Sequence, residues 1–109
     1  MRALCMFMGM SFFVLLPVTA FTADKKFSPS FDCAKASNQV EKAICADRVL
    51  SELDVVMADR YKKALGAASD KKALKSSQRQ WLKQREKCAK ASDVFQCVQK
   101  SYRDRLSQL

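Results

Sequence analysis

The sequence predicts an all-α fold, a small bundle of about four helices stapled by disulfide bonds. Between Cys33 and Leu109 there is no proline and only one glycine, Gly66, while residues that favour helices are abundant. Apolar residues recur in this region at the spacing of one helix face. Four cysteines follow an apolar N-terminal segment, and an even number of cysteines in a small exported chain is typical of a disulfide framework.

The N-terminal segment, residues 1–20, has the pattern of a secretory signal peptide. Arg2 supplies a positive charge, an uncharged apolar run follows, and small residues indicate cleavage after Ala20. A membrane anchor is the rival interpretation, but the run is about as short as a spanning helix allows and Pro17 lies near its end. Cys5 lacks the small-residue context of a lipoprotein site, so we expect it to leave with the signal. The mature protein is then periplasmic or secreted, without a transmembrane segment.

The remaining chain divides into an extended polar lead, residues 21–32, and a helical domain, residues 33–109. Asn38 followed by Glu41 has the spacing of a capping box. This pattern predicts a short first helix that ends near Ala46.

Three longer helices are predicted to follow. Asp47 is expected to cap the second helix and Gly66 to end it. Asp70 is expected to cap the third helix, which ends near Cys88, and Ser92 to cap the fourth. The apolar stripe of the second helix is Leu50, Leu53, Met57, Tyr61, Ala64 and Leu65, and that of the fourth is Phe95, Val98, Tyr102 and Leu106.

The mature chain keeps four cysteines, Cys33, Cys45, Cys88 and Cys97. We favour the sequential pairing, Cys33–Cys45 and Cys88–Cys97, because each bond closes a short local loop, worth roughly 3 kcal/mol in the chain-entropy model. The other two pairings remain open at this stage. Zinc is not expected, because the spacings do not resemble zinc knuckles and an oxidising compartment favours disulfides. Neither a metal site nor a cofactor is predicted.

Polar residues on the apolar faces of two helices require an explanation. Gln78, Trp81 and Arg85 share one face of the third helix, and Asp54 lies beside the stripe of the second. An unpaired buried charge is very costly, so Arg85 is predicted to pair with Asp54. Gln78 is predicted to bind one of the two tyrosine hydroxyls or a backbone carbonyl. We call Asp54, Gln78, Trp81 and Arg85 the polar lock. In the alternative interpretation, Trp81 and Arg85 flank a surface groove that contacts a partner.

The chain is strongly basic, with 20 Lys and Arg against 11 Asp and Glu. Loss of the signal peptide would leave a net charge of +8, which favours anionic partners. Five cations recur every four residues along the third helix, over about 24 Å. We call them the basic ridge: Lys71, Lys75, Arg79, Lys83 and Lys87. The ridge is either a solvated outer face or an anion-binding surface. Aromatic residues are not interleaved with it, so no nucleic-acid partner is expected.

The sequence offers little catalytic chemistry. It has no histidine, which excludes triads with a histidine base. Oxidised cysteines would leave no thiolate nucleophile, and a glycine-rich phosphate loop is missing. The acids are spread singly among bases rather than paired for glycoside hydrolysis. We therefore predict a binding protein rather than an enzyme.

The cysteines, a Gln-Arg-x-Trp-Leu element and a Tyr-x-x-Arg element together form a specific pattern. The segments that carry it are Phe31–Cys33, Glu41–Cys45, Leu50–Asp54, Tyr61, Gln78–Cys88, Cys97 and Tyr102–Leu109. With this pattern, the mature chain resembles the LprI-type family of small secreted domains, named for a lysozyme inhibitor. The resemblance implies a helical, disulfide-stapled domain that binds and inhibits lysozyme in the cell envelope.

The positive net charge of the chain argues against lysozyme as a partner. Common animal lysozymes are strongly basic, and two cationic proteins repel each other at long range. A local acidic patch is therefore predicted as the contact for a basic partner, formed by Glu41, Asp47, Glu52 and Asp59. The alternatives are a module that binds anionic envelope glycan or lipid through the basic ridge, and a general periplasmic partner-binding domain. Added salt should weaken ridge binding steeply and leave lysozyme binding intact.

Overall fold

The computed structural model describes residues 27–109, which fold into four α-helices and two short 3-10 helices. The predicted signal peptide and the first residues of the lead lie outside this part. The elements are η1 (Cys33–Lys35), α1 (Gln39–Ala46), α2 (Arg48–Ala67), α3 (Lys71–Glu86), η2 (Lys87–Lys90) and α4 (Val94–Leu106). The all-α prediction is confirmed, and the third helix ends in a 3-10 turn that contains Cys88.

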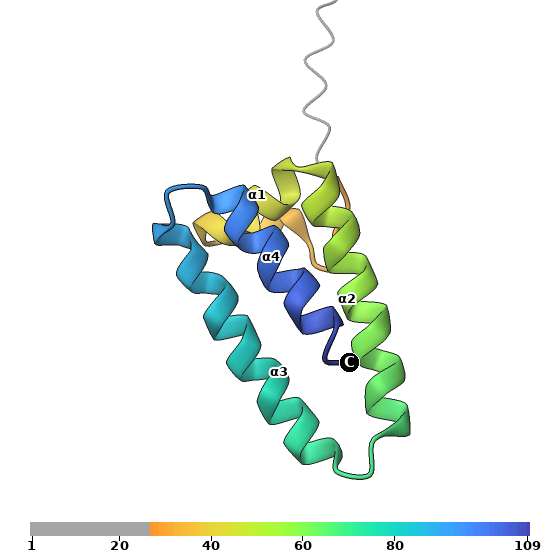
Figure 1. Ribbon diagram of the computed structural model, residues 1–109. Helices are drawn as coiled ribbons and strands as arrows, with labels where there is room; N and C mark the ends of the chain where they lie inside the picture. The colour runs from red at the N-terminus through yellow and green to blue at the C-terminus, as the bar shows by residue number, and fades with distance from the viewer. Residues whose placement is uncertain (1–26) are drawn as a thin grey trace, which may run out of the picture.

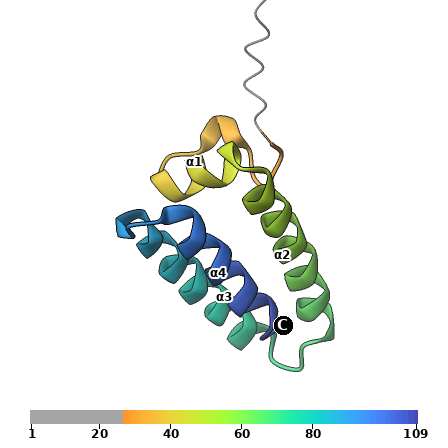
Figure 2. The ribbon, with the colours of Figure 1, turned by 45° about the horizontal axis from the view of Figure 1, so that its top comes forward.

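Helix α4 lies between α2 and α3 (Figure 1). Helices α2 and α3 form a long hairpin, and the chain then turns back at η2, so that α4 runs antiparallel to α3 and in the same direction as α2. The short α1 crosses the end of the bundle where α2 begins (Figure 2). Helices α2 and α4 each contact all three other helices, and α4, which lies between α2 and α3, forms the centre of the fold.

Side-chain caps fix where the helices begin. Asn38, Asp47 and Asp70 each accept a hydrogen bond from the backbone N–H three residues on, at 2.8–2.9 Å, as predicted. The prediction that Ser92 caps the last helix is wrong. The carboxylate of Asp93 takes this position, accepting from the N–H three residues on at 3.0 Å. A carboxylate also meets the positive end of the helix dipole, which a serine hydroxyl cannot match.

The second helix does not end at Gly66, as the sequence had suggested. It continues to Ala67, and the cap residue Ala68 is extended, so the left-handed glycine that ends many helices is not used. Instead, the ammonium group of Lys71 donates hydrogen bonds to the carbonyls of Leu65, Gly66 and Ala68, at 2.6, 3.4 and 3.4 Å. A lysine of α3 therefore satisfies carbonyl groups that the end of α2 leaves free.

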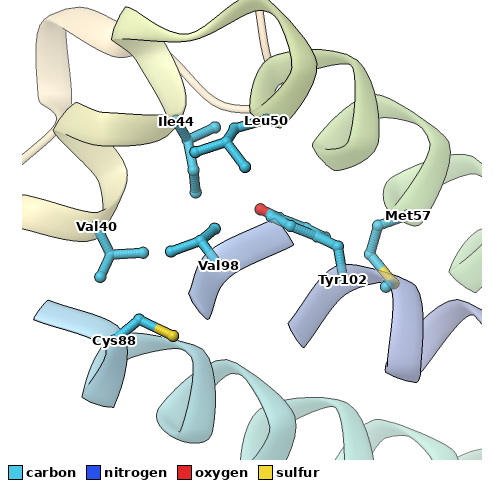
Figure 3. Packing of buried hydrophobic residues seen from close by; sticks show 7 residues of the cluster. All are labelled: Val40, Ile44, Leu50, Met57, Cys88, Val98 and Tyr102. Atoms are coloured by element: carbon cyan, nitrogen blue, oxygen red, sulfur yellow. The ribbon is translucent and has the colours of Figure 1, made fainter. Parts of the chain in front are cut away.

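A single cluster of buried side chains forms the hydrophobic core (Figure 3). Its members come from α1, α2, η2 and α4, and they are Val40, Ile44, Leu50, Met57, Cys88, Val98 and Tyr102. The ring of Tyr102 lies between Met57 and the group formed by Leu50 and Val98. Phe95, predicted to share the apolar stripe of α4, is 37% exposed in the first turn of that helix. The core is therefore built around the middle of α4.

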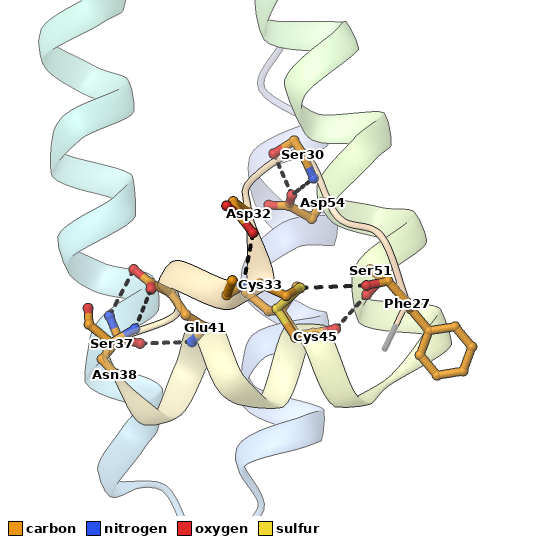
Figure 4. Close-up of a disulfide and its surroundings, with 12 residues drawn as sticks. Phe27, Ser30, Asp32, Cys33, Ser37, Asn38, Glu41, Cys45, Ser51 and Asp54 are labelled. Atoms are coloured by element: carbon orange, nitrogen blue, oxygen red, sulfur yellow. Dashed lines mark hydrogen bonds between the residues drawn. A yellow bond between two sulfur atoms is a disulfide. The ribbon is translucent and has the colours of Figure 1, made fainter. Parts of the chain in front are cut away.

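Two disulfide bonds pair the cysteines sequentially, which confirms the favoured pairing. The bond between Cys33 and Cys45 joins η1, which directly follows the lead, to α1 (Figure 4), and the bond between Cys88 and Cys97 joins η2 to α4. The backbone N–H of Phe27 also donates to the carbonyl of Cys45 at 3.2 Å. The lead is thus held against the bundle by covalent and backbone contacts.

Candidate functional site

A buried hydrogen-bond network connects α2, α3 and α4. The hydroxyl of Tyr102 donates to Asp54 Oδ1 at 2.6 Å and accepts from Arg85 Nη1 at 2.9 Å. Arg85 Nη1 lies 3.7 Å from the same oxygen of Asp54, so the two charges pair with the tyrosine hydroxyl beside them. Both charged side chains are only 7% exposed. Their hydrogen bonds are strong because they are charge-assisted and little screened by water.

The second oxygen of Asp54 binds the lead, a contact that sequence reasoning missed. Ser30 donates its backbone N–H, at 2.7 Å, and its hydroxyl to Asp54 Oδ2 (Figure 4). The lead therefore closes over Asp54 and satisfies its carboxylate. A short Ser-Pro-Ser segment has no helical periodicity that would have indicated this role.

Arg85 has partners on several sides. Its Nε donates to Glu86 Oε1 at 3.2 Å, and its Nη2 binds the same oxygen. The guanidinium carbon lies 5.8 Å from the ring centroids of both Trp81 and Tyr102. Burial disfavours the charged guanidinium, but the oxygen of Tyr102 and the carboxylate of Glu86 outweigh it and raise the pKa of Arg85. Arg85 therefore stays charged.

The phenol of Tyr102 stays protonated well into the alkaline range. Its burial raises the pKa above the ordinary value of 10.0. Arg85 opposes this rise, and the carboxylate of Asp54 adds to it. The hydroxyl therefore remains both a donor to Asp54 and an acceptor from Arg85.

Gln78 has a different partner from the one predicted. Its Oε1 accepts from Arg105 Nε at 3.0 Å, while the Tyr102 hydroxyl binds Asp54 and Arg85. Arg105 Nη2 also donates to Ser77 Oγ at 2.9 Å. Arg105 is 8% exposed. It follows Val98 by seven residues and Tyr102 by three, which places it on the buried face of α4, so the spacing carried a signal for this arginine that the apolar stripe left out.

Trp81 connects α3 to α4 beside Arg85 and Tyr102. Its Nε1 donates to the carbonyl of Ser101 at 3.1 Å, and its ring meets that of Tyr102 edge to face, with centroids 5.2 Å apart. The partly buried indole also lines a groove of about 540 Å³ between α3 and α4, together with polar side chains such as Gln84 and Lys100. Arg85 itself is 6% exposed and presents little surface to a partner.

The network is satisfied internally. Within residues 27–109, every buried side-chain nitrogen and oxygen has a hydrogen-bond partner. Such a closed network fixes the positions of the helices. The surfaces of the domain are therefore where a function has to be sought.

An apolar strip runs along the outer side of α2. Val49, Val55 and Val56 are 42%, 45% and 45% exposed, although valine is a poor helix former and is usually buried. Val55 and Val56 also line a mainly apolar groove of about 540 Å³ beside Phe27. We call this surface the α2 outer face, formed by Val49, Glu52, Val55, Val56 and Asp59.

Two residues of the predicted acidic patch lie on the α2 outer face. Glu52 and Asp59 are exposed, and each forms an ion pair at 3.0 Å, Glu52 with Arg48 one turn before it and Asp59 with Lys63 one turn after it. Glu41 and Asp47 form other hydrogen bonds. Glu41 accepts from the backbone N–H of Ser37 before α1, and Asp47 caps α2. The patch of four acids therefore stays a prediction, and only Glu52 and Asp59 are placed together on the α2 outer face.

Charge is distributed unevenly along the chain. Residues 27–60 carry six acidic and four basic side chains, whereas residues 61–109 carry four acidic and 13 basic ones. The first range includes α1 and most of α2, and the second includes α3 and α4. The positive net charge therefore belongs to the C-terminal part of the domain.

All five residues of the basic ridge are exposed. Lys71 nevertheless does not project freely, because its ammonium group binds the carbonyls at the end of α2. The other four make no ion pair with any side chain of residues 27–109. The ridge is thus shorter at its start than the sequence pattern suggested.

Within residues 27–109, no helix is long and apolar enough to cross a bilayer. The same residues hold no cluster of three or more His, Cys, Asp or Glu side chains that could bind a metal ion. The fold and the site together define a small helical domain with two disulfide bonds. Its buried polar side chains all have hydrogen-bond partners within residues 27–109, and its outer faces are charged or apolar.

This chain belongs to the LprI lysozyme inhibitor family. The family model described as "Lysozyme inhibitor LprI" matches residues 32–109. The chain is also 37% identical, over 90 residues, to proteins named "Lipoprotein LprI" from Mycobacterium bovis and from two strains of Mycobacterium tuberculosis. The aligned part covers 83% of this chain and 45% of each relative, so the chain spans less than half the length of these relatives. No solved structure matches the chain.

Proposed function

We propose that this protein is an exported, non-catalytic binding domain that contacts and inhibits lysozyme in the cell envelope through the α2 outer face. A family named for lysozyme inhibition supports the partner, and relatives named as lipoproteins support the location. The observation that carries the choice of face is the exposure of Val49, Val55 and Val56 on one side of a helix. An exposed apolar strip with a charged rim is typical of a protein contact.

The distribution of charge answers the objection raised by net charge. A basic lysozyme would be repelled by residues 61–109, with their excess of cations, and not by residues 27–60. It would therefore approach the side of the domain formed by α1 and α2. Glu52 and Asp59 are free to take new basic partners there, because exposed ion pairs one turn apart on a helix contribute only about 0.3–0.5 kcal/mol each.

The test of the function is lysozyme activity on bacterial cell walls, with the oxidised mature chain titrated in at physiological salt. We expect saturable inhibition at a stoichiometry near one to one, which is lost when the disulfides are reduced. Absence of inhibition at large excess, against several classes of lysozyme, would reject the proposal.

A pair of variants tests the face. Val56→Arg places a cation on the α2 outer face, and Leu82→Arg does the same on α3, where Leu82 is 38% exposed. Val56→Arg should weaken binding about tenfold or more, as expected for an interface residue, while Leu82→Arg should leave it unchanged. Equal inhibition by both folded variants would reject the α2 outer face as the contact.

A further inference from the structure

We propose that the outer side of α3 binds an anionic lipid bilayer, independently of the lysozyme contact on α2. Six exposed cations project from this side of α3 and from the η2 turn that follows it. We call them the α3 cationic face: Lys72, Lys75, Arg79, Lys83, Lys87 and Lys90. Four of them belong to the basic ridge. Lys72 and Lys90 join them in the structure, while Lys71 is withdrawn to the end of α2.

The six cations form one surface. At about 100° per residue the four cations within α3, Lys72, Lys75, Arg79 and Lys83, fall within a sector of about 80°, directed away from the buried Gln78 and Arg85. From Lys72 to Lys90 the face is about 29 Å long, at about 1.5 Å per residue in α3 and about 2.0 Å per residue in η2. This length and narrow sector allow all six side chains to reach one plane, because lysine and arginine side chains are long and flexible.

No acid neutralises this surface from within the helix. Glu86 is the only acid of α3, and its carboxylate is bound by Arg85. The six cations make no ion pair within residues 27–109. Like charges one turn apart repel, so this arrangement weakens the isolated helix and is relieved when anions bind.

The shape of the face fits a bilayer better than a chain-like polyanion. Helix α3 packs against α4 on one side and leaves the other side free (Figure 1, Figure 2). The three grooves lined by Trp81, by Val55 and by Phe95 contain none of these six cations, which are all exposed. A planar layer of anionic head groups can contact a row of exposed basic side chains together, and each of them is attracted to the negative surface.

The two proposed faces are compatible in one molecule. Helix α3 lies on one side of α4 and α2 on the other (Figure 1). A domain resting on a bilayer through the α3 cationic face would therefore hold the α2 outer face away from the lipid. Substitutions on α3 should leave lysozyme inhibition unchanged, which separates failure of this proposal from failure of the other.

The experiment is co-sedimentation of the oxidised mature chain with vesicles of phosphatidylcholine containing a minority of phosphatidylglycerol. The test variant replaces Lys75, Arg79, Lys83 and Lys87 with glutamine. A matched control replaces Lys35, Lys42, Arg60 and Lys62, exposed cations of η1, α1 and α2, with glutamine. Both variants lose three lysines and one arginine, so their net charges are equal.

The parent chain should bind these vesicles at low salt, bind pure phosphatidylcholine weakly, and dissociate as salt is added. A basic side chain near an anionic membrane contributes a factor of about five, so the test variant should bind at least about 100-fold more weakly and the control less than about tenfold. Equal losses in both variants would show a net-charge effect and overturn the proposal. Absence of vesicle binding, or tighter binding to a soluble anionic polysaccharide at equal charge concentration, would overturn it too.

Discussion

Removing the hydroxyl of Tyr102 should destabilise the domain by about 2–4 kcal/mol. This hydroxyl donates to Asp54 at 2.6 Å and accepts from Arg85 at 2.9 Å, and the side chain is fully buried. A hydrogen bond to a charged group contributes about 1.5–3 kcal/mol, so two of them set the upper part of this range. Some of the loss is recovered, because Arg85 and Asp54 are already 3.7 Å apart and can approach each other directly. In Tyr102→Phe, the ring keeps its packing in the core.

The assay is urea and thermal unfolding of the oxidised mature chain, followed by circular dichroism. A domain of this size loses about 4–8 °C in Tm for each kcal/mol, so Tyr102→Phe should lower Tm by roughly 10–30 °C. The control is Tyr61→Phe, because Tyr61 is only partly buried and its hydroxyl makes no hydrogen bond within residues 27–109. It should change stability by less than about 0.5 kcal/mol. A loss below about 1 kcal/mol for Tyr102→Phe, or equal losses in the two variants, would refute the role of the hydroxyl.

Three further predictions concern stability. Arg85→Ala should cost about 3–5 kcal/mol in urea unfolding, because it leaves the buried Asp54 without its cation, while Arg79→Ala on the exposed side should cost less than about 0.5 kcal/mol. A small loss for Arg85→Ala combined with weakened partner binding would instead favour a contact role. Folding raises the pKa of Tyr102, so the unfolded chain loses this proton at lower pH than the folded one. The free energy of unfolding should therefore fall as the pH rises above about 10, by up to about 1.4 kcal/mol per pH unit. Tyr102→Phe should lack this part of the decrease. Gly66→Ala should raise stability by about 0.5–1 kcal/mol, seen as a higher Tm, because Gly66 is helical and has open space where a Cβ would lie. A lower Tm would mean that the glycine is needed for the turn into α3.

Local chemistry accounts for what was predicted well. Each correct helix cap depends on a side chain and a backbone N–H three residues apart, and each disulfide closes a loop of 9 or 12 residues. The pairing of Arg85 with Asp54 was also accessible, because a charge on an apolar face requires an opposite charge on a neighbouring helix. The same kind of reasoning failed at Gly66. The last carbonyl groups of α2 are bound by Lys71 of the next helix, so the helix does not need a left-handed glycine to end.

The sequence by itself determined the helical class, most helix starts and the need for a buried ion pair, because these depend on residues that are neighbours along the chain or on the cost of an unpaired charge. It favoured the sequential cysteine pairing, which the structure then decided. Only the tertiary structure decided that Tyr102 stands between the two charges, 48 residues from Asp54 in sequence, and that Ser30 and Arg105 complete the polar contacts. The tertiary structure also decided which cations and valines are exposed to solvent. These features depend on how each helix is rotated about its axis and how far it slides against α4, which periodicity within one helix does not specify.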